Sequence, residues 1–557
     1  MKATFKTINT ICRSILNPLS VWGVLGCGLL LTSCLSEHPK GALEEEGAYK
    51  DATSLELATV APLYNYIGGN SDSQGLQGTY RGVYDLNTFT TDEAMLPTRG
   101  GDWYDGGYWQ SLYLHRWTAS DKPFADTWNY LYKVVMLCNR NIATLTANRN
   151  LLTEQRYLTD LAELRALRAM FYFYIMDLWG NVPLVVEATS DVSAAKQVNR
   201  TEIFHFIESE LLETINYLPA VRSNQLGNNY GRITQPVVHF LLAKLYLNTE
   251  VYCPNADAAT HNTHFQNCIT YCDKLEAAGY HLTDNYADNF AVHNETSEEN
   301  IFTIPMNKLL YTNQFKNLFR SRHYSHGSAL GFDAENGSAA TLSTCAIYGY
   351  TDATLDSRPS TLDSRLSPLD QIDPRWYINF YADKVFTDDG TPVMLPDGSQ
   401  LEYQPLAVQL DLTGTPYEKT AGARMHKYAI DYSAYADGNL QENDIVLFRY
   451  ADALLMRAEA KIRLGLDGSS DVNAVRARVE AKPIDAVTLE TILDERLREL
   501  MWEGWRRNDL IRFGRFHVAY DQRPQLAGES TAYTTLFPIP SSIIKLNPNG
   551  IQQNNGY

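Results

Sequence analysis

The segment at residues 161–185 reads LAELRALRAMFYFYIMDLWGNVPLV, and it decides the fold class. Over residues 154–178 apolar side chains recur every three or four positions, which is the spacing of a helix that packs against its neighbours. Gly180 and Pro183 end the pattern, because glycine favours helix ends and proline cannot continue a helix. We therefore predict a long helix over residues 154–178.

The same spacing recurs on both sides of this helix. It predicts further helices over residues 124–145, 201–218, 234–248, 265–278, 444–464 and 489–502. Thr201 is the expected N-cap of the second of these. The helices follow one another in pairs, and the unit length of about 30 to 45 residues is that of tetratricopeptide repeats. We predict an all-α fold with a tetratricopeptide-repeat-like helical scaffold.

Residues 300–437 have a different composition. They are rich in Tyr, Gly, Asp, Ser and Pro, with Asp-Gly turns at 389–390 and 397–398. This pattern predicts short strands and long loops, hence a loop-rich, partly β variable region inserted into the scaffold. Residues 68–118 share the same character. Loops on a rigid scaffold commonly carry ligand sites.

The N-terminus indicates export. Lys2, Lys6 and Arg13 precede an apolar run at residues 21–32 that is too short to span a bilayer. A Leu-Thr-Ser sequence then leads to Cys34, which resembles the bacterial lipobox, where the cysteine thiol is acylated. An ordinary cleaved signal with a chance cysteine is the alternative.

These features divide the chain into three parts. We predict a lipoprotein signal peptide at residues 1–33, a lipidated N-terminus and tether at 34–50, and a binding domain at 51–557, with Cys34 as the lipidation site.

Charge and composition narrow the ligand class. The formal net charge is -18, which disfavours nucleic acid and leaves neutral or basic ligands. Tyr outnumbers Phe by 35 to 20 and there are nine Trp, so flat rings that tolerate water are plentiful.

Five cysteines follow Cys34, namely Cys138, Cys253, Cys268, Cys272 and Cys345. Their odd number and irregular spacing argue against a disulfide framework, although one or two bridges stay open. Cys268 and Cys272 lie four apart in an apolar helical stretch, which favours packing over a metal pair. No metal site and no cofactor are expected; a structural Ca²⁺ in the acidic loops is an open alternative.

Four segments resemble the SusD/RagB family of outer-membrane nutrient-binding lipoproteins. The first is residues 161–185, with its Trp-Gly-Asn-Val-Pro-Leu exit. The second and third are DIVLFRYADALLMRAEA at 444–460 and RLRELMWEGWRRNDLIRFG at 496–514. The fourth is the closing segment 536–557, which departs from the family at Asn555, where proline is common. The resemblance covers essentially the whole chain after the signal, in the family's order.

The resemblance implies a helical scaffold whose variable region carries the ligand site. It also implies a lipid-anchored location at the outer membrane, exposed at the cell surface. The implied partner is a SusC-like TonB-dependent outer-membrane transporter, over which the lipoprotein sits as a lid.

Residues 90–117 read TTDEAMLPTRGGDWYDGGYWQSLYLHRW and are the sharpest candidate site. Sugars stack C–H groups on flat rings and share hydroxyl hydrogen bonds with charged side chains. Candidate rings are Trp103, Tyr104, Tyr108 and Trp109, and candidate polar contacts are Asp92, Arg99, Asp102 and Asp105. Trp103 and Asp102 are the first choices, because glycine pairs flank them. The alternatives are a loop folded onto the scaffold or facing the transporter, with Trp109 in the core.

A second cluster in the variable region is expected to complete the aromatic platform. It comprises His323, Tyr324, Tyr348, Tyr350, Arg375, Trp376 and Tyr377. Asp373-Pro374-Arg375 also resembles a recurring family turn, which favours a structural role there.

Catalysis is not expected. Charged residues of the signature segments lie on amphipathic helices, where ion pairs between helices are the ordinary explanation. They are Glu163, Arg165, Arg168, Arg449, Asp452, Glu459, Glu503, Arg506 and Asp509. The sequence has no HExxH, GxxxxGK[ST] or GxSxG motif. A glycosidase would need two carboxylates of residues 85–105 to lie about 5 to 10 Å apart.

We therefore expect a lipid-anchored outer-membrane glycan-binding protein, not an enzyme, that captures oligosaccharide or polysaccharide for a TonB-dependent transporter. The alternatives are a peptide-binding or protein-binding version with the same lid role, a surface glycoside hydrolase, and a pure protein scaffold.

Overall fold

The computed structural model describes residues 49–188, 195–310, 313–352, 372–434, 440–529 and 533–557. The predicted signal peptide, Cys34 and nearly all of the tether lie outside the described residues. Lys50–Tyr557 forms one compact unit. Among the described residues, no helix combines the length and apolarity that crossing a bilayer requires.

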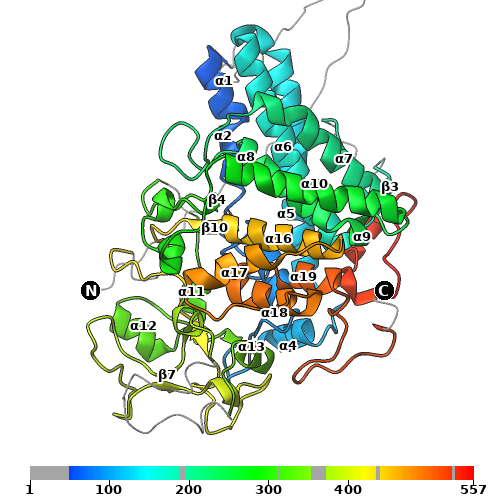
Figure 1. Cartoon of the computed structure of the whole chain (residues 1–557). Helices are drawn as coiled ribbons and strands as arrows, with labels where there is room; N and C mark the ends of the chain where they lie inside the picture. The colour runs from blue at the N-terminus through cyan, green and yellow to red at the C-terminus, as the bar shows by residue number, and fades with distance from the viewer. Residues whose placement is uncertain (1–48, 189–194, 311–312, 353–371, 435–439, 530–532) are drawn as a thin grey trace, which may run out of the picture. The chain divides into compact units, whose positions relative to one another are not determined.

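Three long helices build the first half of the scaffold: α5 (Lys122–Ala147), α6 (Glu154–Trp179) and α7 (Arg200–Thr214), with α6 packed against both others (Figure 1). Thr153 caps α6 by accepting a hydrogen bond from the Arg156 backbone N–H. Gly180, at φ 73°, ends the helix. All residues from 166 to 179 are buried, so the central part of α6 is enclosed on every side.

The second half continues the same packing. Helices α8 (Gln235–Leu247) and α10 (Ala258–Ala277) lie side by side in Figure 1, and α16 (Tyr450–Arg463) packs on both. Helices α17 (Ser469–Arg478) and α18 (Leu489–Leu500) pack against α16. The prediction of an all-α, tetratricopeptide-repeat-like scaffold is confirmed.

Shorter elements connect and close the scaffold. They are α1 (Ala52–Thr59), α2 (Ala61–Tyr64), α3 (Val83–Thr88), α4 (Tyr108–Tyr113), α9 (Thr249–Tyr252), α19 (Arg506–Arg512) and α20 (Ser541–Leu546), and the paired strands β2 (Val182–Pro183) and β3 (Gln197–Val198).

Three predicted boundaries were wrong. Residues 444–464 do not form one helix, because they begin with strand β10 (Ile445–Arg449), antiparallel to β4 (Asn300–Ile304). All five residues of β10 are buried, so an uninterrupted apolar run replaces the alternation of a half-exposed strand. Helix α7 is capped by Asn199, not Thr201, and α10 starts earlier, with Asp257 as its cap.

The described parts of residues 300–437 consist of short elements and long connections, as expected (Figure 1). The described elements after β4 are α11 (Asn317–Arg320), α12 (Tyr324–Leu330), β5 (Ala339–Ala340), α13 (Leu342–Ile347), α15 (Trp376–Asn379), β6 (Phe380–Tyr381), β7 (Asp383–Lys384), β8 (Glu402–Tyr403) and β9 (Arg424–Met425). Strand β6 pairs with β9 and β7 with β8. Strand β1 (Ala94–Met95) pairs with β5, which joins the loop after β1 to this region.

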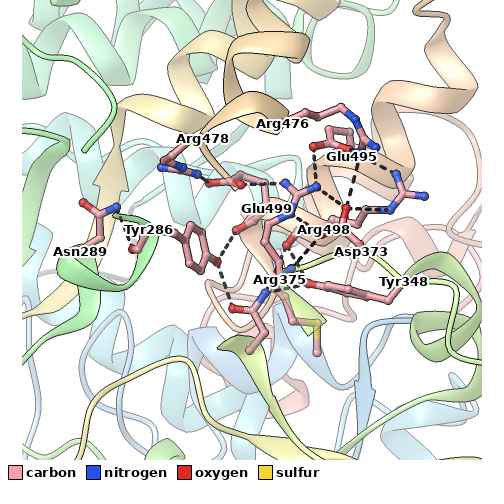
Figure 2. A network of polar contacts seen from close by, with 12 residues as sticks. Tyr286, Asn289, Tyr348, Asp373, Arg375, Arg476, Arg478, Glu495, Arg498 and Glu499 are labelled. Carbon is pink, nitrogen blue, oxygen red and sulfur yellow. Dashed lines mark hydrogen bonds and ion pairs between the residues drawn. The ribbon is translucent and has the colours of Figure 1, made fainter. Parts of the chain in front are cut away.

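A buried ion network holds this region on the scaffold (Figure 2). Arg375 lies 2.8 Å from Asp373, 2.7 Å from Glu495 and 2.9 Å from Glu499, the last two on α18. Burial alone would raise the pKa of Glu499, but Arg478, Arg449 and Arg375 outweigh it and hold that pKa well below its usual range. Such a network stabilises only when every charge is paired.

The charged residues of the signature segments have structural partners. Arg449 pairs with Glu299, Glu499 and Glu503, and Arg512 with Glu459 and Asp509. The five cysteines Cys138, Cys253, Cys268, Cys272 and Cys345 are all buried free thiols.

Candidate functional site

The loop at residues 99–107 begins with a tight turn and continues in a strained conformation. The Arg99 N–H donates to the Asp102 carbonyl at 3.0 Å, and the Asp102 N–H donates back at 3.3 Å. Trp103 and Asp105 then adopt the left-handed region, at φ 59° and 42°. Non-glycine residues seldom do so, at a cost of about 1 to 3 kcal/mol each, and such strain clusters at ligand sites.

Asp102 joins three segments that are far apart in the sequence. The Tyr324 hydroxyl, at the start of α12, donates to its carboxylate at 2.8 Å, and the Lys419 ammonium does so at 2.9 Å. Partial burial raises the pKa of Asp102, but these hydrogen bonds outweigh it and lower that pKa below its usual value. The carboxylate is therefore ionised and fixed at neutral pH, while its side chain stays 34% exposed.

Trp103 is half-buried. Its indole N–H donates to the Glu335 carbonyl at 2.8 Å, and its ring meets Tyr80 and Trp109 edge to face, each at 6.0 Å between centroids. A Cβ added at Gly337 would lie only 2.8 Å from the Trp103 ring, so that ring rests on backbone. The next residue, Tyr104, is 55% exposed and has the most accessible ring of the loop.

Asp105 already has two partners. Its carboxylate accepts from Arg81 at 2.5 Å and from the Trp109 indole N–H at 2.8 Å. It therefore orients the loop more than it offers an open acceptor. We call residues 99–107 together with Tyr324 and Lys419 the loop site.

Two residues of the predicted loop contacts are in the core. Trp109 is 1% exposed and Arg99 is fully buried, so neither reaches a ligand in this structure. The Arg99 guanidinium donates to the carbonyls of Gly337, Glu418 and Ala421, which ties the loop to two segments of the variable region. The sequence predicted Arg99 as a ligand contact, but in the structure it positions the loop.

The second predicted cluster is divided by burial, because Tyr324 and Tyr377 are 42% and 49% exposed while its other three large rings are in the core. Tyr348, Tyr350 and Trp376 are each 1% exposed. Tyr350 stacks on Trp376 at 4.4 Å, and the Tyr348 hydroxyl, beside the network of Figure 2, donates to the Arg498 carbonyl at 2.7 Å. Three large rings with satisfied polar groups make a core, and the expectation of stacking contacts there is corrected.

Exposed aromatic side chains are concentrated in the loop site and in the variable region. Those of the described part of the chain are Tyr104, Tyr217, Tyr324, Tyr377, Phe386, Tyr417 and Tyr432, and all but Tyr217 belong to the loop site or to residues 300–437. The sequence interpretation missed Tyr417, Lys419 and Tyr432. Local pattern carried no signal for them except the tyrosine-rich composition of the region.

Three acids of residues 90–117 are paired with cations. Asp92 is held by Arg506 at 2.7 Å, Asp105 by Arg81, and Asp102 by Lys419. A glycosidase acid needs a raised pKa together with access to substrate. The pKa of Asp102 is lowered, and Glu93, whose pKa burial raises to about 8, is only 1% exposed. Within the described residues, no group of three or more His, Cys, Asp or Glu side chains is placed to hold a metal ion.

Comparison with known proteins agrees with the fold. The model of the SusD family matches residues 254–557, and a model described as starch-binding, associating with the outer membrane, matches residues 76–247. The chain belongs to the SusD family.

Individual relatives span nearly the whole chain. The starch-binding protein SusD of Bacteroides thetaiotaomicron is 26% identical, over 96% of this chain and 97% of its own length. A solved laminarin-binding SusD-like protein is 21% identical with a TM-score of 0.67, covering 91% of this chain and 100% of that one. Surface glycan-binding protein A of Bacteroides thetaiotaomicron, in complex with laminarihexaose, is 19% identical with a TM-score of 0.66 and the same coverage. At these identities the two structures show a shared fold.

Proposed function

We propose that this protein binds neutral oligosaccharide or polysaccharide at the loop site. The observation that carries the proposal is a pair of exposed rings, Tyr104 and Tyr324, beside the carboxylate of Asp102, which hydrogen bonds from Tyr324 and Lys419 hold in place. A pyranose would stack on Tyr104 and Tyr324, donate hydroxyl hydrogen bonds to Asp102 and accept one from Lys419. Relatives whose names specify starch or laminarin support a neutral glucan as the ligand class.

The expected affinity suits capture. Two or three such contacts, each contributing about 1 to 1.5 kcal/mol, sum to roughly 4 kcal/mol, or about millimolar affinity. A polymer that engages many anchored copies gains about two to four decades in avidity. Fixed carboxylates with cationic partners favour binding over hydrolysis.

We further propose that Cys34 anchors the protein to the outer membrane at the cell surface, and that the protein delivers glycan to a SusC-like TonB-dependent transporter. The lipobox-like sequence and the family support this proposal. Metabolic labelling with a fatty-acid analogue should mark the wild-type protein and leave Cys34→Ser unlabelled. Equal labelling of both would contradict anchoring at Cys34.

Glycan binding is tested by affinity electrophoresis of residues 35–557 through native gels that contain starch, laminarin or another neutral polysaccharide. We expect at least one polymer to retard the wild-type protein and Tyr217→Ala, but not Tyr104→Ala. Tyr217 is the matched control, because it is an exposed tyrosine (42%) on the helical scaffold. Retardation by no neutral polymer would contradict the proposal. Release of reducing ends over time would indicate the hydrolase alternative.

A further inference from the structure

A groove of about 1020 Å³ adjoins the loop site. One side is α12 with Tyr324, and the other is formed by residues 387–396, with Tyr432 also in the lining. Tyr324 belongs to both places, because its hydroxyl bonds Asp102 while its side chain lines the groove. The groove is therefore continuous with the loop site at Tyr324.

Two tyrosine rings of the groove are fixed in the same manner. The Tyr324 hydroxyl donates to Asp102 at 2.8 Å, and the Tyr432 hydroxyl donates to Asp388 at 2.6 Å. The rings nevertheless remain 42% and 58% exposed. A ring held by its hydroxyl and open to solvent is a preorganised stacking surface, because binding costs it little side-chain entropy.

The groove wall is held in place by apolar packing and by one hydrogen bond to the residue before α12. Val385, Val393, Leu401 and Tyr403 form a small apolar core beneath residues 387–396. The Tyr403 hydroxyl accepts from the His323 backbone N–H at 2.8 Å, directly before α12. The wall and α12 are thus joined through one side chain, and no rearrangement is needed to open the space between them.

The lining selects against acidic ligands. Among the described residues that line the groove there is no lysine, arginine or histidine, whereas Asp388 and Asp389 are present. Carboxylated or sulfated sugars would meet like charge without a counter-ion. Met394, which is 50% exposed, and Leu395 supply apolar surface, which suits the C–H faces of neutral sugars.

We propose that this groove is a second arm of the glycan site, which takes the continuing chain of a neutral oligosaccharide bound at the loop site. This inference rests on the proposed function. A volume of about 1020 Å³ lies at the upper end of small-molecule sites, so it suits several sugar units and not one. The protein would then select for chain length, with Tyr324 as the junction and Tyr432 as the distal ring.

The test is isothermal titration of residues 35–557, which retain the whole unit Lys50–Tyr557, with malto- and laminari-oligosaccharides of two to seven glucose units. For whichever series binds, wild-type affinity should rise with length. Tyr432→Ala should weaken the longest ligands about tenfold and leave the shortest within about twofold. Tyr104→Ala should weaken all lengths, and Tyr217→Ala none. Tyr432→Phe, which keeps the ring but loses the bond to Asp388, should fall between wild type and Tyr432→Ala.

The outcomes separate the two proposals. Length-independent wild-type affinity, or wild-type behaviour of Tyr432→Ala at every length, would overturn the second arm and leave the loop site standing. Binding of a basic peptide that depends on Tyr432, with no such dependence for glycans, would also overturn it. Binding of no oligosaccharide in either series would overturn the second arm together with glucan binding. Because Tyr432 is exposed, its variants should keep the wild-type thermal midpoint.

Discussion

Asp102 is the residue on which the loop site converges, since Tyr324 and Lys419 both donate to its carboxylate. Asp102→Asn removes the charge that both donors and any sugar hydroxyl share. We expect glycan affinity to fall about tenfold, because a charge-assisted hydrogen bond becomes a neutral one. Isothermal titration with the glycan that retards the wild-type protein in the native gels measures the change in affinity.

Asp467→Asn is the control for this variant, because Asp467 is an acid that accepts from the Ser469 N–H before α17, outside the loop region. Equal glycan affinities of Asp102→Asn and Asp467→Asn would show that Asp102 does not contribute to binding.

Arg99 acts on the site through the backbone. Arg99→Met would leave the carbonyls of Glu418 and Ala421 without this buried donor, whereas the Gly337 carbonyl would keep its hydrogen bond from Arg424. We expect the free energy of unfolding to drop by about 2 to 4 kcal/mol, since each buried unpaired acceptor costs about 1 kcal/mol or more. Urea unfolding measures it, and Arg99→Lys should recover only part, because one ammonium cannot reach all three carbonyls. A stability equal to wild type would show that these bonds contribute nothing net.

The site residues show what sequence alone reveals at this scale. Residue type pointed to rings and acids in this loop, and Asp102 and Tyr104 are accessible, while their contact with a ligand stays a prediction. It did not distinguish them from Arg99 and Trp109, because burial there depends on contacts with residues more than 200 positions away. Tyr432 was missed for the same reason, since its exposure is set by tertiary packing.

At the scale of elements, helix α6 depends on how it ends. Gly180 adopts φ 73°, and a Cβ there would lie 2.7 Å from the Leu536 side chain. We expect Gly180→Ala to lower the free energy of unfolding by about 3 kcal/mol, through left-handed strain plus a clash in a packed region.

Gly514→Ala is the matched control, because Gly514 has φ 66° and nothing within 4 Å of its added Cβ. It should cost only about 1 kcal/mol. Equal decreases in the free energy of unfolding of the two variants, measured by urea unfolding, would show that the Leu536 side chain moves aside without a free-energy cost.

Helices were predictable where apolar residues recurred at helical spacing over several turns and a stop signal followed, as in α6. The failure at residues 444–464 has a physical cause. Ile445 to Phe448 satisfy a helical stripe and a buried strand equally well, and pairing with β4, about 140 residues earlier, decides between them. Local periodicity cannot contain that information, so the element type was lost where a short buried strand runs directly into a helix.

At the scale of the whole molecule, stability should depend on pH through groups that burial keeps neutral. Burial lowers the pKa of His115, His239, His323 and His426 to about 4. The unfolded chain therefore binds more protons than the folded one between about pH 4 and 6.5, and stability is lost as the pH falls through that window. Above about pH 6.5 these imidazoles are neutral in both states.

Glu93 changes the pH dependence of stability in the opposite direction, and its effect reaches a higher pH. Burial raises its pKa to about 8, while its carboxylate accepts from the Trp502 N–H. The folded protein therefore holds a proton that the unfolded chain has released, so this contribution is full below about pH 4.5 and is lost as the pH rises to about 8. Between pH 6.5 and 8 we expect the free energy of unfolding to fall by up to about 1.4 kcal/mol per pH unit, or roughly 2 kcal/mol in all. Glu93→Gln imitates the protonated acid and should make this window flat when urea unfolding is measured at half-unit steps. A wild-type curve that is flat from pH 6.5 to 8, or a variant that keeps the wild-type slope, would show that Glu93 is ionised in the folded protein.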